Sequence, residues 1–350
     1  MFSSLLEEIY SQPTALNTLI DHTLSSCKEL NQNVTKSYNR KKFNKVIFTG
    51  MGSSLFASRS ASIYLINNGI HSCCIDTSEL LHYTSNILDE KTLLILVSQS
   101  GRTIEIVKLL ESIKKLDLEK WLVTNDENCE ITNQVSMVYN THAGNEKNTS
   151  IKTYTNTVLS LIFCAYLISG KLGENIFKDC FEASELINGS LDSLKKKTID
   201  IARDLVGSDF LSLIARGPSL STANQGSLII KETLRKYSES MSSGQFRHGP
   251  LEIAGEGHFA IVFAPSGNTY DINKNLAAEM KNYGSNVVFI TDNTDKPTKN
   301  LNTIILPKVK KELTPLTEII PIEFIIYNYA AIKDFNTGGF SRISKVTISE

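Results

Sequence analysis

The sequence lacks the features that mark membrane, secreted or disulfide-rich proteins. Its longest apolar run, around residues 158–169, is shorter than the roughly 20 residues of a transmembrane helix. The N-terminus carries acidic residues where a signal peptide needs basic ones, and it has no long apolar core. The six cysteines form no CxxC pair, and none follows Cys180. We therefore expect a cytoplasmic protein with reduced cysteines.

An excess of basic charge is also missing. The 36 lysines and arginines are balanced by 37 aspartates and glutamates, so the chain lacks the basic footprint of many nucleic-acid binders. The ligand spacing of a zinc site is absent. An apolar fraction of 41% and a charged fraction of 21% exclude a disordered, collagenous or coiled-coil chain. At about 150 residues per domain, the length of 350 residues predicts two domains.

What the sequence does contain is an internal repeat. Three pairs of segments match in the same order at offsets of 165, 166 and 167 residues: 52–58 with 217–223, 98–103 with 264–269, and 123–126 with 290–293. Matches at a nearly constant offset indicate two copies of one domain.

Short apolar runs alternate with helical stretches in each copy, which predicts a parallel sheet with helices on both faces. In residues 103–116, Ile104, Val107, Leu110 and Ile113 are spaced like one helical face. The expected strands are 45–49, 92–97, 121–124, 137–139, 210–215, 258–264 and 286–291. The expected helices are 1–40, 55–65, 103–116, 152–169, 176–196, 220–234, 271–282 and 319–333.

Two turns rich in glycine and serine follow expected strands of the first copy. They read GMGSS at residues 50–54 and SQSGRT at 98–103. Ligands bind beyond the carboxyl ends of parallel strands, and helix N-termini attract anions. A single turn of this kind is explained by helix capping. Two turns that converge on one sheet edge favour a phosphate cradle.

Neither turn matches a nucleotide-binding motif, because GxxxxGK[ST] and GxGxxG are both absent from them. The second copy has Ala264-Pro265-Ser266 where the first has Ser98-Gln99-Ser100. We therefore expect phosphate to bind at the first copy only.

The second copy carries a different polar cluster, Lys231-Glu232 followed by Arg247-His248-Gly249-Pro250. A glutamate, a lysine and a histidine suffice for proton transfer. Taken alone, Glu232 is better explained as a carboxylate on a helix surface and His248 as a turn residue before Gly249-Pro250, and composition does not distinguish these interpretations from the catalytic one.

These motifs together resemble the double sugar-isomerase (SIS) domain family, close to the isomerase half of glucosamine-6-phosphate synthase. SQSGRT resembles the family's phosphate loop SQSGxT, and Lys231-Glu232 with RHGPLE resembles its active-site stretch KE…KHGPL. The resemblance covers nearly the whole chain. Further matching segments are 8–16, 52–54, 78–80, 146–155 and 344–347.

The resemblance implies an α/β fold with two tandem, flavodoxin-like αβα sandwich domains. We place a helical lead-in at residues 1–40, the phosphate-binding domain at 41–195, and the second domain with its catalytic tail at 196–350. The residues implied to bind the phosphate of a hexose 6-phosphate are Ser53, Ser54, Ser98, Gln99, Ser100 and Thr103.

The resemblance also implies catalytic roles. Glu232 would move a proton between C1 and C2, His248 would open the sugar ring, and Lys345 would contact the open-chain sugar beside Ser344. The family's histidine comes from the neighbouring subunit, which implies a homodimer with shared active sites. An enediol route needs no metal or other cofactor, and we expect no nucleic-acid or membrane partner.

Several departures from the synthase point to a related activity. From where the sequence begins we expect no glutaminase domain, and Ile229 stands where the synthase has a lysine. The tail SRISKVTISE resembles those of glucosamine-6-phosphate deaminases and fructosamine-6-phosphate deglycases. One residue is deleted within 146–152, so we assign no role there.

The sequence therefore predicts an aldose–ketose isomerase-type enzyme of amino-sugar metabolism. The favoured reaction converts glucosamine 6-phosphate into fructose 6-phosphate and ammonia, and a fructosamine-6-phosphate deglycase is the alternative enzyme. A sugar-phosphate sensor without catalysis is a third hypothesis. The presence of the implied catalytic residues Glu232, His248 and Lys345 favours an enzyme over a sensor. Residues 1–40 are also too short and not basic enough for a sensor's DNA-binding domain.

Overall fold

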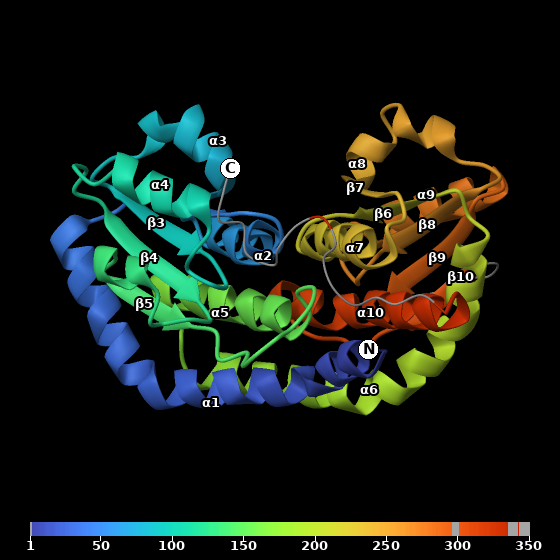
Figure 1. The fold of residues 1–350 in the computed structure, drawn as a ribbon, viewed down its shortest axis with the longest axis horizontal. Coiled ribbons are helices and arrows are strands. Elements are labelled where there is room, and N and C mark those ends of the chain that lie inside the picture. The colour runs from blue at the N-terminus through green and yellow to red at the C-terminus, as the bar shows by residue number, and fades with distance from the viewer. Residues whose placement is uncertain (1, 296–300, 335–341, 343–350) are drawn as a thin grey trace. The chain divides into compact units, whose positions relative to one another are not determined.

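The computed structural model describes residues 2–295, 301–334 and 342, and it contains two five-stranded parallel sheets (Figure 1). The chain divides into two compact units, each with one sheet. Of the described residues, unit 1 holds 2–13, 147–149, 183–295 and 301–334, whereas unit 2 holds 14–146, 150–182 and 342.

The sheet of unit 2 has the strand order β2-β1-β3-β4-β5 and that of unit 1 has the order β7-β6-β8-β9-β10. These orders are the same once the strands are counted within each copy, and every neighbouring pair is parallel. The predicted repeat and the α/β fold class are thus confirmed. The strands are β1 (Lys45–Gly50), β2 (His71–Asp76), β3 (Thr92–Val97), β4 (Glu119–Thr124), β5 (Met137–Asn140), β6 (Phe210–Ala215), β7 (Ser238–Ser242), β8 (His258–Phe263), β9 (Asn286–Thr291) and β10 (Asn302–Ile305).

Helices flank both sheets. They are α1 (Phe2–Lys41), α2 (Ser53–Asn67), α3 (Thr77–His82), α4 (Ile104–Ser112), α5 (Lys152–Ile168), α6 (Glu174–Val206), α7 (Ser219–Leu234), α8 (Ser243–Phe246), α9 (Tyr270–Asn282) and α10 (Thr314–Ile332). All eight expected helices are present, although α4 ends earlier, α6 ends later and α10 begins earlier than expected. The short helices α3 and α8 were not expected from the sequence. The predicted domain boundary at residues 195/196 lies inside α6, and it stays a prediction.

The sequence prediction missed β2, β7 and β10, and all three are edge strands. β2 reads HSCCID with no fully buried residue, and β7 reads SESMS with one. Edge strands keep one side open to solvent, so they do not need the continuous apolar run that marks the central strands.

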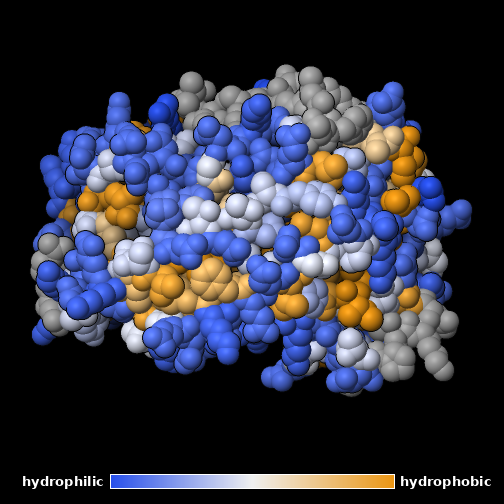
Figure 2. Space-filling view, turned by 90° about the horizontal axis from the view of Figure 1, so that it is seen from below, coloured by the Kyte–Doolittle hydropathy of each residue, from blue (hydrophilic) through white to orange (hydrophobic). Residues whose placement is uncertain are grey.

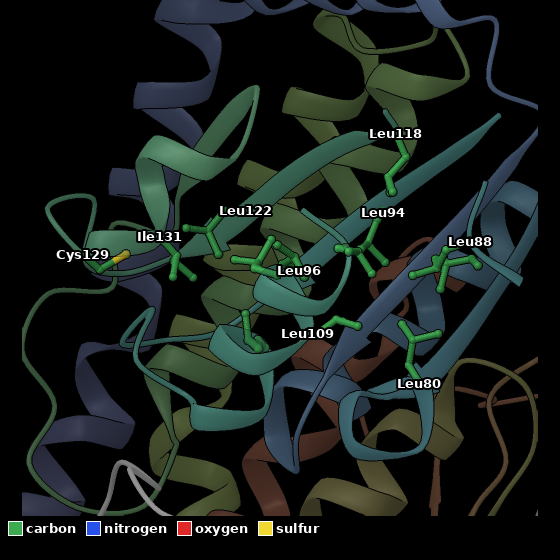
Figure 3. Packing of buried hydrophobic residues seen from close by; sticks show 13 residues of the cluster. Leu80, Leu88, Leu94, Leu96, Leu109, Leu118, Leu122, Cys129 and Ile131 are labelled. Atoms are coloured by element: carbon green, nitrogen blue, oxygen red, sulfur yellow. The ribbon is translucent and has the colours of Figure 1, made fainter. Parts of the chain in front are cut away.

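The predicted apolar face of α4 was partly wrong, because Val107 is 39% exposed. The buried face instead presents Ile106, Leu109 and Leu110 to the sheet of unit 2. Figure 3 shows Leu109 in one cluster with leucines from the central strands, including Leu94 of β3. This packing holds α4 against the sheet and so positions the turn that precedes it.

The face drawn in Figure 2 is mixed, with hydrophilic residues around smaller groups of apolar residues. Large side chains that remain exposed include Tyr83 of unit 2 and Tyr237 of unit 1. More than half of an ordinary protein surface is apolar, so these groups alone identify no interface. Among the described helices, none has the length and hydropathy needed to cross a membrane.

Candidate active site

Two polar turns lie side by side at the carboxyl edge of the sheet of unit 2. β1 ends at Gly50, which pairs with Val97 at the end of β3. A Cβ atom added to Gly50 would lie 2.8 Å from the carbonyl oxygen of Val97, so only glycine lets the strands end this close together. The predicted convergence of the two turns is therefore confirmed.

The first turn leads directly into α2. Gly52 precedes the helix with φ 51, a left-handed conformation that glycine adopts without strain. Ser53 and Ser54 then form the first two residues of α2, and the N–H of Ser54 donates to the Met51 carbonyl at 3.1 Å. Within the described part of the chain, no side chain hydrogen-bonds to either serine hydroxyl, so both are available to a ligand.

The second turn joins β3 to α4 and is held by its own hydroxyls. The Oγ atom of Ser98 lies 2.9 Å from Oγ1 of Thr103, and Ser100 Oγ accepts the N–H of Arg102 at 3.2 Å. The Gln99 carbonyl accepts the N–H of Asn125 at 3.0 Å. These bonds hold the turn in a defined shape, so little ordering is required when a ligand binds.

Gly101 anchors the same turn. It has φ 62, and an added Cβ atom would lie 2.1 Å from Sγ of the buried Cys129. Any side chain at this position would clash with the packed core. Arg102, which follows, pairs with Asp126 at 3.2 Å, and its side chain is largely exposed.

The candidate base Glu232 lies in the last part of α7 in unit 1. Its Oε2 atom accepts a hydrogen bond from Oγ1 of Thr149, a buried residue of the segment 147–149 that belongs to unit 1. No role was predicted for this segment from its sequence. No spacing signal could have found the contact, because it joins residues 83 positions apart.

His248 is exposed and sits in the turn after α8, where its backbone N–H donates to the Gln245 carbonyl at 2.9 Å. Arg247 beside it pairs with Glu279 at 2.8 Å. Ile229, where the synthase pattern has a lysine, is fully buried in α7. The predicted sugar contacts Ser344 and Lys345 lie outside the described residues.

The start of α5, next to the segment of Thr149, is fixed by Glu146 of unit 2. Its Oε1 atom accepts the backbone N–H groups of Ile151 at 3.0 Å and Thr153 at 3.1 Å. Its Oε2 atom accepts the Thr153 hydroxyl. This carboxylate therefore caps the N-terminus of α5.

Comparison with known families agrees with this architecture. The model of the SIS domain matches residues 40–167 and 205–333, which is more than half of the chain. The chain belongs to the SIS-domain family. Its two matches coincide with the two copies of the internal repeat.

A glutamine–fructose-6-phosphate aminotransferase (isomerizing) of Pyrococcus horikoshii is 28% identical over 341 residues. The match covers 95% of this chain but 55% of that enzyme, so the SIS-domain chain spans about half the length of this relative. Among solved structures, the C-terminal domain of glucosamine-fructose-6-phosphate aminotransferase from Francisella tularensis has a TM-score of 0.84 at 21% identity, covering 95% of this chain and 96% of that one. Glucosamine-6-phosphate deaminase from Thermotoga maritima has a TM-score of 0.78 at 19% identity, covering 98% and 99%. These structural likenesses show the shared fold.

Among the described residues, no group of three or more His, Cys, Asp or Glu side chains is placed to hold a metal ion. Unit 2 thus holds hydroxyl groups suited to binding an anion, and unit 1 holds an oriented carboxylate.

Proposed function

We propose that this SIS-domain chain is a phosphosugar isomerase-type enzyme that converts glucosamine 6-phosphate and water into fructose 6-phosphate and ammonia. The observation that carries the proposal is the pair of hydroxyl-lined turns at the N-termini of α2 and α4. The names of the relatives support the substrate class, because they comprise an aminotransferase of fructose 6-phosphate and a deaminase of glucosamine 6-phosphate.

The phosphate is held by the two turns of unit 2. Hydroxyls of Ser53 and Ser54 donate from the first turn, and the second turn contributes donors around Ser100. The helix dipoles of α2 and α4 favour the phosphate dianion at the same place. The full proposed set is Ser53, Ser54, Ser98, Gln99, Ser100 and Thr103.

The proposed reaction needs one base that transfers a proton between C2 and C1 of the open-chain sugar. The Glu232 carboxylate removes the C2 proton of the open-chain aldehyde and returns it to C1, through an enolamine. The product carries an imine at C2, which water hydrolyses to the ketone with release of ammonia. The Thr149 hydroxyl holds the carboxylate in one orientation by donating to Oε2. General bases placed in this way contribute about 10²–10⁴-fold.

The remaining roles complete the proposal. His248 opens the sugar ring, and Lys345 with Ser344 contacts the open-chain sugar. The exposed position of His248 suits a side chain that serves the site of a neighbouring subunit, so we propose a homodimer with shared active sites. Because Ile229 is buried and carries no amine, α7 offers no lysine for imine chemistry at that position.

The test is an assay of ammonia and fructose 6-phosphate released from glucosamine 6-phosphate by the purified chain. The two products should appear in equal amounts. A panel of fructosamine 6-phosphates is assayed in parallel, and turnover of these alone would establish the deglycase instead. Sugar-phosphate binding without turnover of any member would establish the sensor.

Matched variants connect the activity to the site. Glu232→Gln keeps the size of the side chain but cannot accept a proton near neutral pH, so kcat should fall at least about a hundredfold. Glu185→Gln makes the same change at an exposed position of α6 and should leave kcat unchanged. A Glu232→Gln enzyme with near-normal kcat would refute the proposed base.

A further inference from the structure

The second copy retains the geometry of a phosphate turn. β6 occupies the place of β1 in its sheet, and α7 follows β6 as α2 follows β1. At the offset of 165 residues, Ser219 at the start of α7 is the equivalent of Ser54. The N-terminus of α7 therefore presents the same kind of anion-attracting site as the N-terminus of α2.

A carboxylate of the chain already occupies that site. Glu318 of α10 is only 3% exposed, and both of its oxygens accept hydroxyls from the first turn of α7. Ser219 Oγ donates to Oε1 at 2.7 Å, and Thr222 Oγ1 donates to Oε2 at 3.2 Å. The Glu318 carboxylate thus accepts the hydroxyl hydrogen bonds that a phosphate would need.

The second turn of this copy is occupied in the same way. The backbone N–H of Ser266, the equivalent of Ser100, donates to Oδ1 of Asp292 at 2.5 Å. The first copy has Asn125 at the position that corresponds to Asp292 at the offset of 167. A neutral amide of the first copy is therefore a carboxylate in the second.

The first copy shows the contrasting arrangement. Within the described residues, no carboxylate accepts a hydrogen bond from the hydroxyl of Ser54 or Ser100. The two copies thus have turns at the same places in the fold, but a carboxylate of the chain accepts hydrogen bonds from these turns in the second copy.

We propose that Glu318, assisted by Asp292, takes the place of a ligand phosphate in the second copy and is the residue that prevents a sugar phosphate from binding there. The inference rests on the proposed function only for its premise that the turns of unit 2 bind phosphate. A second negative charge next to the buried Glu318 and the half-buried Asp292 is repelled, and the hydroxyl donors have no capacity left for it.

The test measures how many inorganic phosphate ions bind per chain by isothermal titration calorimetry. The titration is run at pH 8, because burial raises the pKa of Glu318 to about 7 and the carboxyl is then ionised. The double variant Glu318→Gln, Asp292→Asn should bind one more phosphate per chain than the wild type. Adding Ser219→Ala to that variant should abolish the extra binding.

A matched control comes from the same helix. Glu323 is also fully buried in α10, and its Oε2 atom accepts from Gln12 Nε2 at 2.6 Å. Glu323→Gln therefore removes a buried charge without adding a phosphate. A folded double variant with the same stoichiometry as the wild type would overturn the proposal.

The number of phosphate ions bound per chain tests this inference separately from the proposed function. A wild type that binds no phosphate contradicts the role of unit 2, while an increase of one in the variant still supports the role of Glu318. If the double variant does not fold, wild-type crystals soaked in phosphate decide the question. Phosphate at Ser219 overturns the inference, and phosphate confined to the turns of unit 2 supports it.

Discussion

The hydrogen bond between Thr149 and Glu232 provides a quantitative test of the proposed chemistry. Thr149→Val removes the hydroxyl but keeps the shape of a buried side chain. A hydrogen bond to a charged group contributes about 1.5–3 kcal/mol, and about 1.4 kcal/mol corresponds to a tenfold change. We therefore expect kcat/KM for glucosamine 6-phosphate to fall about 10- to 150-fold, measured by ammonia release.

The comparison of single and double variants shows whether the two residues act together. Thr149→Ser keeps the hydroxyl and should retain most of the activity. If the hydroxyl acts only through the carboxylate, adding Thr149→Val to Glu232→Gln should cost little beyond Glu232→Gln alone. Full activity in Thr149→Val, or losses that multiply in the double variant, would refute the reasoning.

Three further outcomes are expected. Ser100→Ala should raise the Kd for fructose 6-phosphate roughly ten- to a hundredfold, whereas Ser266→Ala should change it little, and calorimetry that finds equal effects would contradict binding at one copy. Mixing inactive Glu232→Gln and His248→Ala protomers should restore activity in heterodimers, and no rescue would appear if one chain supplied both groups. Burial lowers the pKa of His258 to about 4, so between about pH 6.5 and 4 the unfolded chain binds a proton that the folded chain does not. Stability should fall across this window as the pH falls, by about 3 kcal/mol, and urea titrations should show a smaller fall in His258→Gln.

Much of the fold was determined by the sequence itself. The central strands β3, β6 and β9 were predicted with their observed bounds, because strands buried on both faces are mostly apolar. The repeat in the sequence likewise predicted two sheets with one topology. Both signals are local or periodic, so they can be recognised without knowing which distant residues meet.

The position of the two glycine- and serine-containing turns was also predictable, because these residues directly follow buried strands. Gly50, Gly52 and Gly101 are the residues whose lack of a side chain the backbone requires there. The exposed Val107 shows the limit of periodicity: a helical face can be expected from spacing, but the neighbouring elements decide which residues are buried.

Only the tertiary structure decided which partners the polar groups have. Thr149 meets Glu232 across 83 residues, and Glu318 meets Ser219 across 99. Neither contact has a sequence signature, because a buried carboxylate can be satisfied by any donor that folding brings within reach. The sequence therefore determined the two copies of the fold. Long-range packing determined that a carboxylate of the chain binds the first turn of α7, whereas no described carboxylate accepts from the hydroxyl of Ser54 or Ser100.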